Sequence, residues 1–408
     1  ILRETPKKPL FRLDATQIIV LGFLGVVLAG TALLMLPIST VNREVTPFID
    51  ALFTSTSAAC VTGLTVAETG TYWSVFGKCV ILLLIQIGGL GFMSIALLFS
   101  LVARRRITPR ERMVFAQSQN LSDLSGIVKF AKFIFYCTFS VEGVGALLLA
   151  VRFIPQYGVS DGIAKSIFHS VSAFCNAGFD IIGHCDSLSG YAADPYLSVL
   201  ISLLVIVGGL GFYVWRDLFL YFRKKQRLSP YSKLVLFATA GLLVSGTLLL
   251  FAFENENPAF DAFSRPKLFL TSFFQSAVTR TAGFYTIPLS ELSSTSKAVS
   301  MVLMFIGGAS GSTAGGIKVG TFAVIMIAMA ATIRGKNSFV VFGRRISLNN
   351  VLRAMGILAV GIAFVSISTL LICLAEPQLL FADVLYEVIS AFATVGQTLG
   401  ITPYLTVF

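Results

Sequence analysis

Four stretches of the chain share one pattern, and this repetition constrains the fold more than any other feature of the sequence. Each stretch opens with an aromatic residue and closes ten residues later with a glycine: 53–63, 168–178, 273–283 and 386–396. A second pattern follows the first three glycines, as IGGLGF at 87–92, VGGLGF at 207–212 and the degraded IGGASG at 306–311. Because self-similarity at a regular interval marks one structural unit used several times, we divide the chain into repeats over residues 1–112, 113–227, 228–345 and 346–408.

Each repeat contains apolar segments of two different lengths. Hydrophobic residues make up 55% of the chain and charged residues only 12%, whereas soluble proteins carry about 25% charged residues. An apolar helix crosses a bilayer in about 20 residues. We therefore expect first spans (M1) near 16–36, 127–153, 234–253 and 351–374, and second spans (M2) near 74–101, 196–221 and 298–333.

The apolar stretch between the two spans of a repeat, such as 49–58, is too short to cross a bilayer. A short helix followed by irregular backbone is tolerated at membrane depth only where it faces protein or a water-filled cavity, which indicates a re-entrant pore loop (P). The predicted fold class is an all-α polytopic membrane protein with four tandem M1–P–M2 repeats around a pseudo-fourfold pore. The sequence stops at Phe408, so we expect the fourth M2 helix to be absent from this chain.

The net charge of +11 is distributed unevenly along the chain. Basic residues gather before the first span and between repeats: Arg3, Lys7, Lys8, Arg12, Arg104, Arg105, Arg106, Arg110, Arg112, Arg223, Lys224, Lys225, Arg227, Lys233, Arg334, Lys336, Arg344, Arg345 and Arg353. An excess of Lys and Arg marks cytoplasmic segments, which predicts a cytoplasmic N-terminus and one orientation for all repeats. The opposite segments are acidic, with Glu68 and Asp180 among them; they either concentrate cations or merely lack the positive bias.

The glycine of each loop has a geometric explanation. A bare cation meets a cost on the order of 20 kcal/mol in a low-dielectric interior, and backbone carbonyls from several loops can replace its water. Glycine takes the positive φ that such a loop requires, although a single glycine is more often a turn or a helix contact. The fourfold alignment favours a filter whose carbonyls bind the ion: Val61, Thr62, Gly63, Asn176, Ala177, Gly178, Thr281, Ala282, Gly283, Thr394, Val395 and Gly396.

The predicted second span of the third repeat contains the stretch FIGGASGSTAGGIKVGTF at 305–322. So many glycines cannot hold a straight helix against lipid, so we expect an unwound segment on the cytoplasmic side of the filter that acts as a gate. A kinked helix packed against a neighbour remains the alternative, and a phosphate-binding loop is excluded because Ile317 stands where that motif needs lysine. The predicted gate residues are Gly307, Gly308, Ser310, Gly311, Ser312, Thr313, Gly315, Gly316 and Lys318.

Other reactive side chains are few. The six cysteines include no CxxC pair, so we expect buried free thiols and not a disulfide framework or a zinc site. Glu142 lies within the span predicted near 127–153, where a carboxylate is either functional or hydrogen-bonded within the bundle. Because no constellation of His, Asp, Glu and Ser lies in the spans, we expect no enzyme. Inverted repeats, common in secondary transporters, would alternate the charge bias, which makes that class the second choice.

Together these motifs resemble the Trk/Ktr/HKT potassium-transport superfamily, specifically its KtrB- or KtrD-type membrane subunits. The resemblance rests on LMLPIST at 34–40, IDALFTSTSAACVTGL at 49–64, IQIGGLGFM at 85–93, FHSVSAFCNAGF at 168–179, TRTAGF at 279–284 and the stretch 305–322. The first span begins close to the N-terminus, without the two extra leading helices of Trk-type members. An arginine that the family carries in the fourth M2 lies beyond this sequence.

The resemblance implies potassium uptake across the bacterial inner (cytoplasmic) membrane, with Gly63 in the first loop favouring potassium over sodium. It further implies a homodimer, a cytosolic ring of nucleotide-binding RCK regulatory subunits (KtrA- or KtrC-like) on the basic face, and sodium as a possible activator. No cofactor is expected in this chain itself, since the nucleotide belongs to the partner subunit. Membrane lipid is expected around the spans, and nucleic acid is not expected as a partner.

Overall fold

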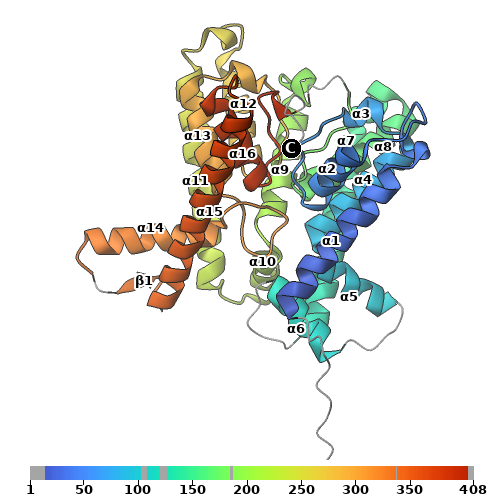
Figure 1. Cartoon of the computed structure of the whole chain (residues 1–408). Helices are drawn as coiled ribbons and strands as arrows, with labels where there is room; N and C mark the ends of the chain where they lie inside the picture. Colours follow the sequence, from blue (N-terminus) through green and yellow to red (C-terminus); the bar gives the residue numbers. More distant parts are fainter. Residues whose placement is uncertain (1–13, 103–107, 120–125, 184–186, 337, 403–408) are drawn as a thin grey trace, which may run out of the picture.

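The computed structural model describes residues 14–102, 108–119, 126–183, 187–336 and 338–402. The predictions that concern Arg3, Lys7, Lys8, Arg12 and Arg104 to Arg106 lie outside the described residues. Figure 1 shows long helices running alongside one another, with shorter helices and loops packed between them.

Among the described residues, four single helices are long and apolar enough to cross a membrane, and they coincide with the four predicted first spans. They are α1 (Ala15–Leu34), α7 (Ile127–Tyr157), α11 (Pro230–Glu254) and α15 (Leu348–Ala375). Their outward faces carry large apolar side chains, and Leu374 on α15 is 78% exposed. Such faces are unfavourable in water and favourable against lipid tails, so this is a multi-pass membrane protein.

A shorter helix follows each of these spans, packs against it and ends just before a repeated glycine. The four are α2 (Phe48–Ala59), α8 (Val159–Phe174), α12 (Arg265–Val278) and α16 (Phe381–Phe392). The longest of them, α8, has 16 residues, fewer than the roughly 20 that a spanning helix needs. Each is therefore too short to cross a membrane by itself.

The predicted second spans are all interrupted, although the sequence pattern predicts a break only in the third repeat. The observed pieces are α4 (Val75–Leu90) with α5 (Phe92–Val102), α9 (Pro195–Gly209) with α10 (Phe212–Lys224), and α13 (Ser294–Phe305) with α14 (Val319–Ile333). Gly91 and Gly211 have φ of 79° and 88°, which no α-helix contains. The prediction of a continuous 196–221 span is wrong, because α9 and α10 meet at 98°.

Smaller elements connect the spans. They comprise α3 (Thr69–Tyr72), α6 (Pro109–Ser118), and 3-10 turns at Pro37–Ser39, Ser189–Tyr191, Pro258–Phe260 and Leu289–Glu291. An antiparallel hairpin of β1 (Phe339–Val341) and β2 (Arg344–Ile346) joins α14 to α15, which adds two short strands to the predicted all-helical fold. Phe342 at its tip lies 6.0 Å from Phe237 of α11, measured between ring centroids.

The five described cysteines are all free thiols, but the expectation that they are buried is wrong for Cys60 and Cys79, which are exposed. Cys175, at the end of α8, is fully buried. The largest hydrophobic cluster joins the helices of the first two repeats around Ile81, Phe115 and Phe174. This packing places the ends of the short helices, and the loops that follow them, in the middle of the molecule.

Candidate functional site

The four repeated glycines lie together and form a closed ring. A side-chain carbon at Gly178 would lie 2.5 Å from the main-chain oxygen of Ala282, and one at Gly283 would lie 2.7 Å from that of Val395. A side-chain carbon at Gly396 would overlap the oxygen of Thr62, and one at Gly63 would overlap that of Ala177. Each glycine thus faces the carbonyl just before the next glycine, and the fourth loop returns to the first.

The four loops share a backbone conformation that places positive φ angles at two positions. The glycines have φ between 71° and 92°. The residue two positions earlier is also positive, at Val61 (58°), Asn176 (61°), Thr281 (77°) and Thr394 (53°). Positive φ costs a β-branched residue about 1–3 kcal/mol and persists only where its surroundings enforce it. The positive φ at this second position was not predicted from the sequence, because the side chains there carry no common local sign of it.

Main-chain hydrogen bonds to the preceding helix hold the strained turn. The amide of Thr62 donates to the carbonyl of Ser57 at 2.7 Å, and that of Ala177 donates to Ser172 at 2.7 Å. The fourth loop repeats the bond from Val395 to Ser390 at 2.8 Å. In the third loop the equivalent amide, on Ala282, donates instead to Val278 at 2.9 Å. The third loop is therefore built differently from the other three.

The short helices point their C-termini at the ring. The helices α2, α8 and α16 end four residues before their glycines, and α12 ends five residues before its own. A helix C-terminus carries about half a negative charge. Four such ends around one centre make the ring favourable for a cation.

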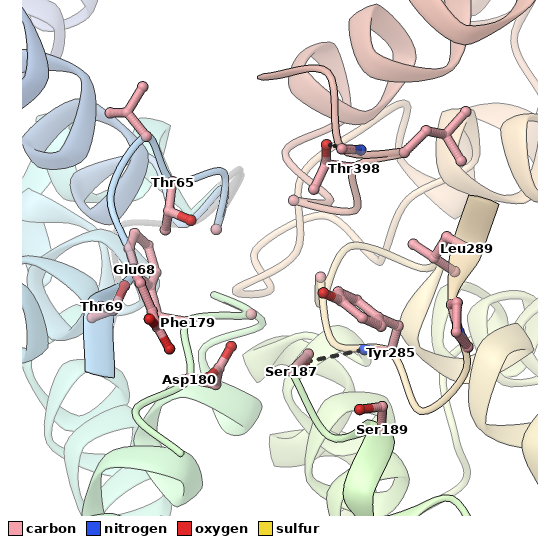
Figure 2. Close-up of a pocket in the computed structure, with 18 of the residues that line it drawn as sticks. Thr65, Glu68, Thr69, Phe179, Asp180, Ser187, Ser189, Tyr285, Leu289 and Thr398 are labelled. Atoms are coloured by element: carbon pink, nitrogen blue, oxygen red, sulfur yellow. Dashed lines mark hydrogen bonds between the residues drawn. The ribbon is translucent and has the colours of Figure 1, made fainter. Parts of the chain in front are cut away.

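On one side the ring opens into a cavity of about 540 Å³ that all four glycines help to line. Figure 2 shows side chains from all four repeats around this space, with hydroxyl groups of Thr65, Ser189 and Thr398 among them. The carboxylates of Glu68 and Asp180 lie in the same wall. Acidic groups in a recess raise the local concentration of cations.

The segment between α13 and α14 is unwound and folded back on itself. Ile306 and Ile317 form a parallel bridge, and the amide of Gly307 donates to the carbonyl of Ile317 at 3.0 Å. The predicted gate residues Gly307, Gly308, Ser310, Gly311, Ser312, Thr313, Gly315 and Gly316 all lie within this fold, so the kinked-helix alternative is wrong. Lys318, at its end, donates from Nζ to the carbonyl of Ala314 at 2.5 Å.

The tip of this segment reaches the loops at the end opposite the cavity. Thr313 Oγ1 donates to the carbonyl of Phe174 at the end of α8, at 3.1 Å. A side-chain carbon at Gly315 would overlap the Thr394 hydroxyl and would lie 2.5 Å from the Ala393 carbonyl oxygen. Because Phe174, Ala393 and Thr394 precede the glycines whereas the cavity residues follow them, the ring lies between the cavity and the tip.

Glu142 lies beside the second loop, on α7, and is 5% exposed. Its two carboxylate oxygens accept from Gln86 Nε2 at 3.1 and 3.2 Å. The Cys175 thiol lies 3.7 Å from Oε1, and Ser170 Oγ donates to the main-chain carbonyl of Glu142 at 2.6 Å. These contacts fit the interpretation of Glu142 as a hydrogen-bonded group of the bundle.

Two further polar residues near the ring were missed in the sequence analysis. Arg280, three residues before Gly283, is 6% exposed, and its Nη2 donates to Thr239 Oγ1 at 3.5 Å. Gln397, directly after Gly396, is fully buried. Both interrupt the repeat pattern, since Cys60, Cys175 and Ala393 match the first position, and Leu64, Phe179 and Phe284 match the second. The sequence could have pointed to both residues, because each differs from the residues at the same position of the other repeats.

The sequence of this chain matches a known protein family and several of its members. The sequence profile of the TrkH cation transport proteins matches residues 2–408. The chain is 42% identical over 398 residues to the potassium/sodium uptake protein NtpJ of Enterococcus hirae, covering 97% of this chain and 88% of that protein. It is 39% identical over 397 residues to the Ktr system potassium uptake protein B of Bacillus subtilis, with the same coverage of 97% and 88%.

The fold also matches a solved structure, the potassium transporter TrkH from Vibrio parahaemolyticus. The TM-score is 0.72 at 20% sequence identity, over 96% of this chain and 78% of that one. At this identity the match supports the fold alone. The family profile and the two relatives confirm the resemblance carried by the sequence motifs, and the chain belongs to the TrkH family of cation transport proteins.

Proposed function

We propose that this chain is the ion-conducting subunit of a Ktr-type system for potassium uptake, and that the ring of four loops is its selectivity filter. The observation that carries the proposal is the closed ring, in which each glycine meets the carbonyl that precedes the next one. Carbonyl oxygens held at fixed positions can replace the water that an ion loses on entry. As a member of a transport family, the chain is not an enzyme.

The ion path runs from the acidic cavity, through the ring, to the folded segment between α13 and α14. The carboxylates of Glu68 and Asp180 concentrate cations at the entrance. The carbonyls of the glycine and of the two residues before it then coordinate the ion in each loop. The four helix C-termini stabilise the cation as it passes.

The folded segment acts as the gate in this proposal. Its tip contacts the second loop through Thr313 and the fourth loop through Gly315, so it stands across the path on the far side of the ring. The Lys318 ammonium is bound to the carbonyl of Ala314, which assigns it to the internal structure of the gate. Conduction then requires the tip to leave the loops.

The proposal also covers the orientation of the chain in the membrane and its partner proteins. The hairpin residues Arg344 and Arg345, with Lys336 before them, face the cytoplasm if the excess of basic residues governs insertion, and the N-terminus then lies on that side. The name of the Bacillus relative places it in a Ktr system. For this chain we propose a homodimer in a bacterial cell membrane, with a regulatory RCK ring on the basic face and sodium as an activator.

The filter is tested by Gly283→Ala in the full-length protein, expressed in a strain that lacks other potassium uptake. The added carbon would lie 2.7 Å from the Val395 oxygen at a φ of 71°. Strain of about 1–3 kcal/mol corresponds to a change of roughly five- to 150-fold in rate. We expect weaker potassium flux into liposomes and poorer selectivity against sodium. Gly241→Ala on α11, where nothing lies within 4 Å, is the control. Equal flux and selectivity in both variants would count against the filter.

A sodium-coupled secondary transporter is the second candidate, because one relative is named a potassium/sodium uptake protein. Flux measurements separate the two functions. A fixed stoichiometry between potassium and sodium movement indicates coupling, whereas potassium flux that continues without sodium indicates a channel.

A further inference from the structure

The outer ends of the first three filter loops are held in two different ways. In the first loop, Ser57 Oγ donates to the carbonyl of Leu64, the residue after Gly63, at 2.7 Å. In the second loop, Ser172 Oγ donates to the carbonyl of Phe179 at 2.7 Å. A serine six positions before the glycine thus ties the outer end of the loop to its own helix.

The third loop cannot use this tie, because Ala277 stands at the serine position. The carbonyl of Phe284, the residue after Gly283, instead accepts from Gln397 Nε2 at 3.0 Å. Gln397 belongs to the fourth loop, where it directly follows Gly396. The bond that the third loop lacks internally is therefore supplied by its neighbour in the ring.

Gln397 is itself held by two side chains. Gln275 on α12 exchanges two amide hydrogen bonds with it, at 3.0 and 3.2 Å. The hydroxyl of Tyr386 on α16 donates to Gln397 Oε1 at 3.1 Å. The three side chains are 0–2% exposed, and buried amides are tolerated when their hydrogen bonds are satisfied, as they are here.

These residues are the positions at which the repeats stop resembling one another. Gln397 replaces the apolar residue that follows the glycine in the other loops, and Tyr386 replaces the phenylalanine that opens them. Ser390, which keeps the serine position of the fourth loop, has a hydroxyl with no hydrogen-bond partner among the described residues. The departures at Gln397 and Tyr386 meet in one network at the boundary between the third and fourth loops.

We propose that Gln397 is a positioning residue for ion selectivity, which replaces across the loop boundary the serine that the third loop lacks. The inference rests on the proposed filter function. A filter distinguishes ions by carbonyls held in place, and the Gln397 amide holds the carbonyl next to Gly283. Without it, the Phe284 carbonyl loses this hydrogen bond and its position becomes less fixed, so the preference for potassium over sodium falls.

The test is Gln397→Leu in the full-length protein, since leucine is the residue at this position of the first loop. We expect the potassium-to-sodium flux ratio in liposomes to fall roughly two- to tenfold, the range that loss of one net hydrogen bond gives. Adding Ala277→Ser to this variant restores a hydroxyl at the position of Ser57, and we expect the ratio to return toward wild type. Gln117→Leu on α6, whose amide bonds only to exposed Thr16 among the described residues, is the matched control.

A purely structural role predicts a different result. Gln397→Leu would then lower the melting temperature without changing the flux ratio, and Ala277→Ser would not restore selectivity; either result overturns the proposal. If Gln397→Leu does not fold, the double variant decides: a folded protein with wild-type selectivity supports the proposal, and one with a lowered ratio contradicts it. Loss of selectivity in Gly283→Ala with an unchanged ratio in Gln397→Leu would remove this inference and leave the filter standing.

Discussion

The second and third repeats break their second spans at the same point, in two different ways. Between α9 and α10 only Leu210 and Gly211 leave the helix, and the chain turns by 98°. Between α13 and α14 the break is much longer, and its residues fold back to the loops. Figure 1 shows α10 and α14 leaving the break regions toward different sides of the molecule. The glycine motif thus yields a simple bend in one repeat and a longer, folded-back segment in the other.

The two breaks are joined by hydrogen bonds. The amide of Ala309 donates to the carbonyl of Gly209 at 2.9 Å, and the amide of Phe212 donates to the carbonyl of Gly311 at 2.9 Å. The short break therefore provides a rigid edge on which the long one rests. We infer that the short break between α9 and α10 supports the long break between α13 and α14, and that the long break acts as the gate.

Shortening the long break tests this difference with the largest expected effect. Deletion of residues 310–315 removes the tip, including the Gly311 and Thr313 bonds. Because each net hydrogen bond contributes about 0.5–1.5 kcal/mol, we expect potassium flux into liposomes to rise roughly tenfold or more. Flux at or below the wild-type level in a protein that elutes as a single folded species would contradict the gate.

The second prediction changes the short break between α9 and α10 by adding a side chain at its glycine. Gly211 has φ 88° and ψ 143°, a region open essentially to glycine, and a side-chain carbon there would lie 3.0 Å from the Ser310 carbonyl oxygen. We expect Gly211→Ala to destabilise the folded protein by about 1–3 kcal/mol, seen as a lower melting temperature. Gly143→Ala on α7, with open space around it, provides the reference. Equal melting temperatures in these two variants would show that the bend does not depend on glycine.

A single side chain of the tip should have the smallest effect. Thr313→Val keeps the shape of the side chain and removes the contacts of Oγ1 to the Phe174 carbonyl and to Asn176 Oδ1. The single hydroxyl proton serves one of these acceptors at a time. One net hydrogen bond is worth about 0.5–1.5 kcal/mol, so we expect potassium flux to increase roughly two- to tenfold. Selectivity against sodium should not change, because the filter carbonyls are retained. A fall in selectivity without a rise in flux would assign Thr313 to the filter instead of the gate.

Much of the fold follows from local pattern. The first spans near 16–36 and 351–374 were predicted within a few residues of α1 and α15, because a continuous apolar run of that length has few alternatives. The unwound segment after α13 was predicted as well, because its glycines are too many for a helix. The break at Gly91 was missed, since the three glycines of IGGLGF also suit a close helix contact.

The candidate site was predicted unevenly for the same reason. The four glycines were found because each stands at the same place in a repeated stretch. The strained φ of Thr281 and Thr394 was missed, since threonine normally avoids positive φ and its surroundings enforce it here. The expectation that Cys60 is buried failed, because an apolar neighbourhood in sequence does not reveal which side chains other parts of the chain will cover.

Local sequence patterns determined one part of this structure, and contacts between distant residues determined the other. Span length, helix-breaking glycines and charge bias are properties of short stretches, and they were enough to indicate a helical membrane protein with several spans. The order in which the loops touch, the tip against Thr394 and the bond from Gln397 to Phe284 join residues far apart in the sequence, 113 positions in the last case. Such contacts depend on how the helices pack, because a hydrogen bond forms only when packing brings donor and acceptor within about 3 Å.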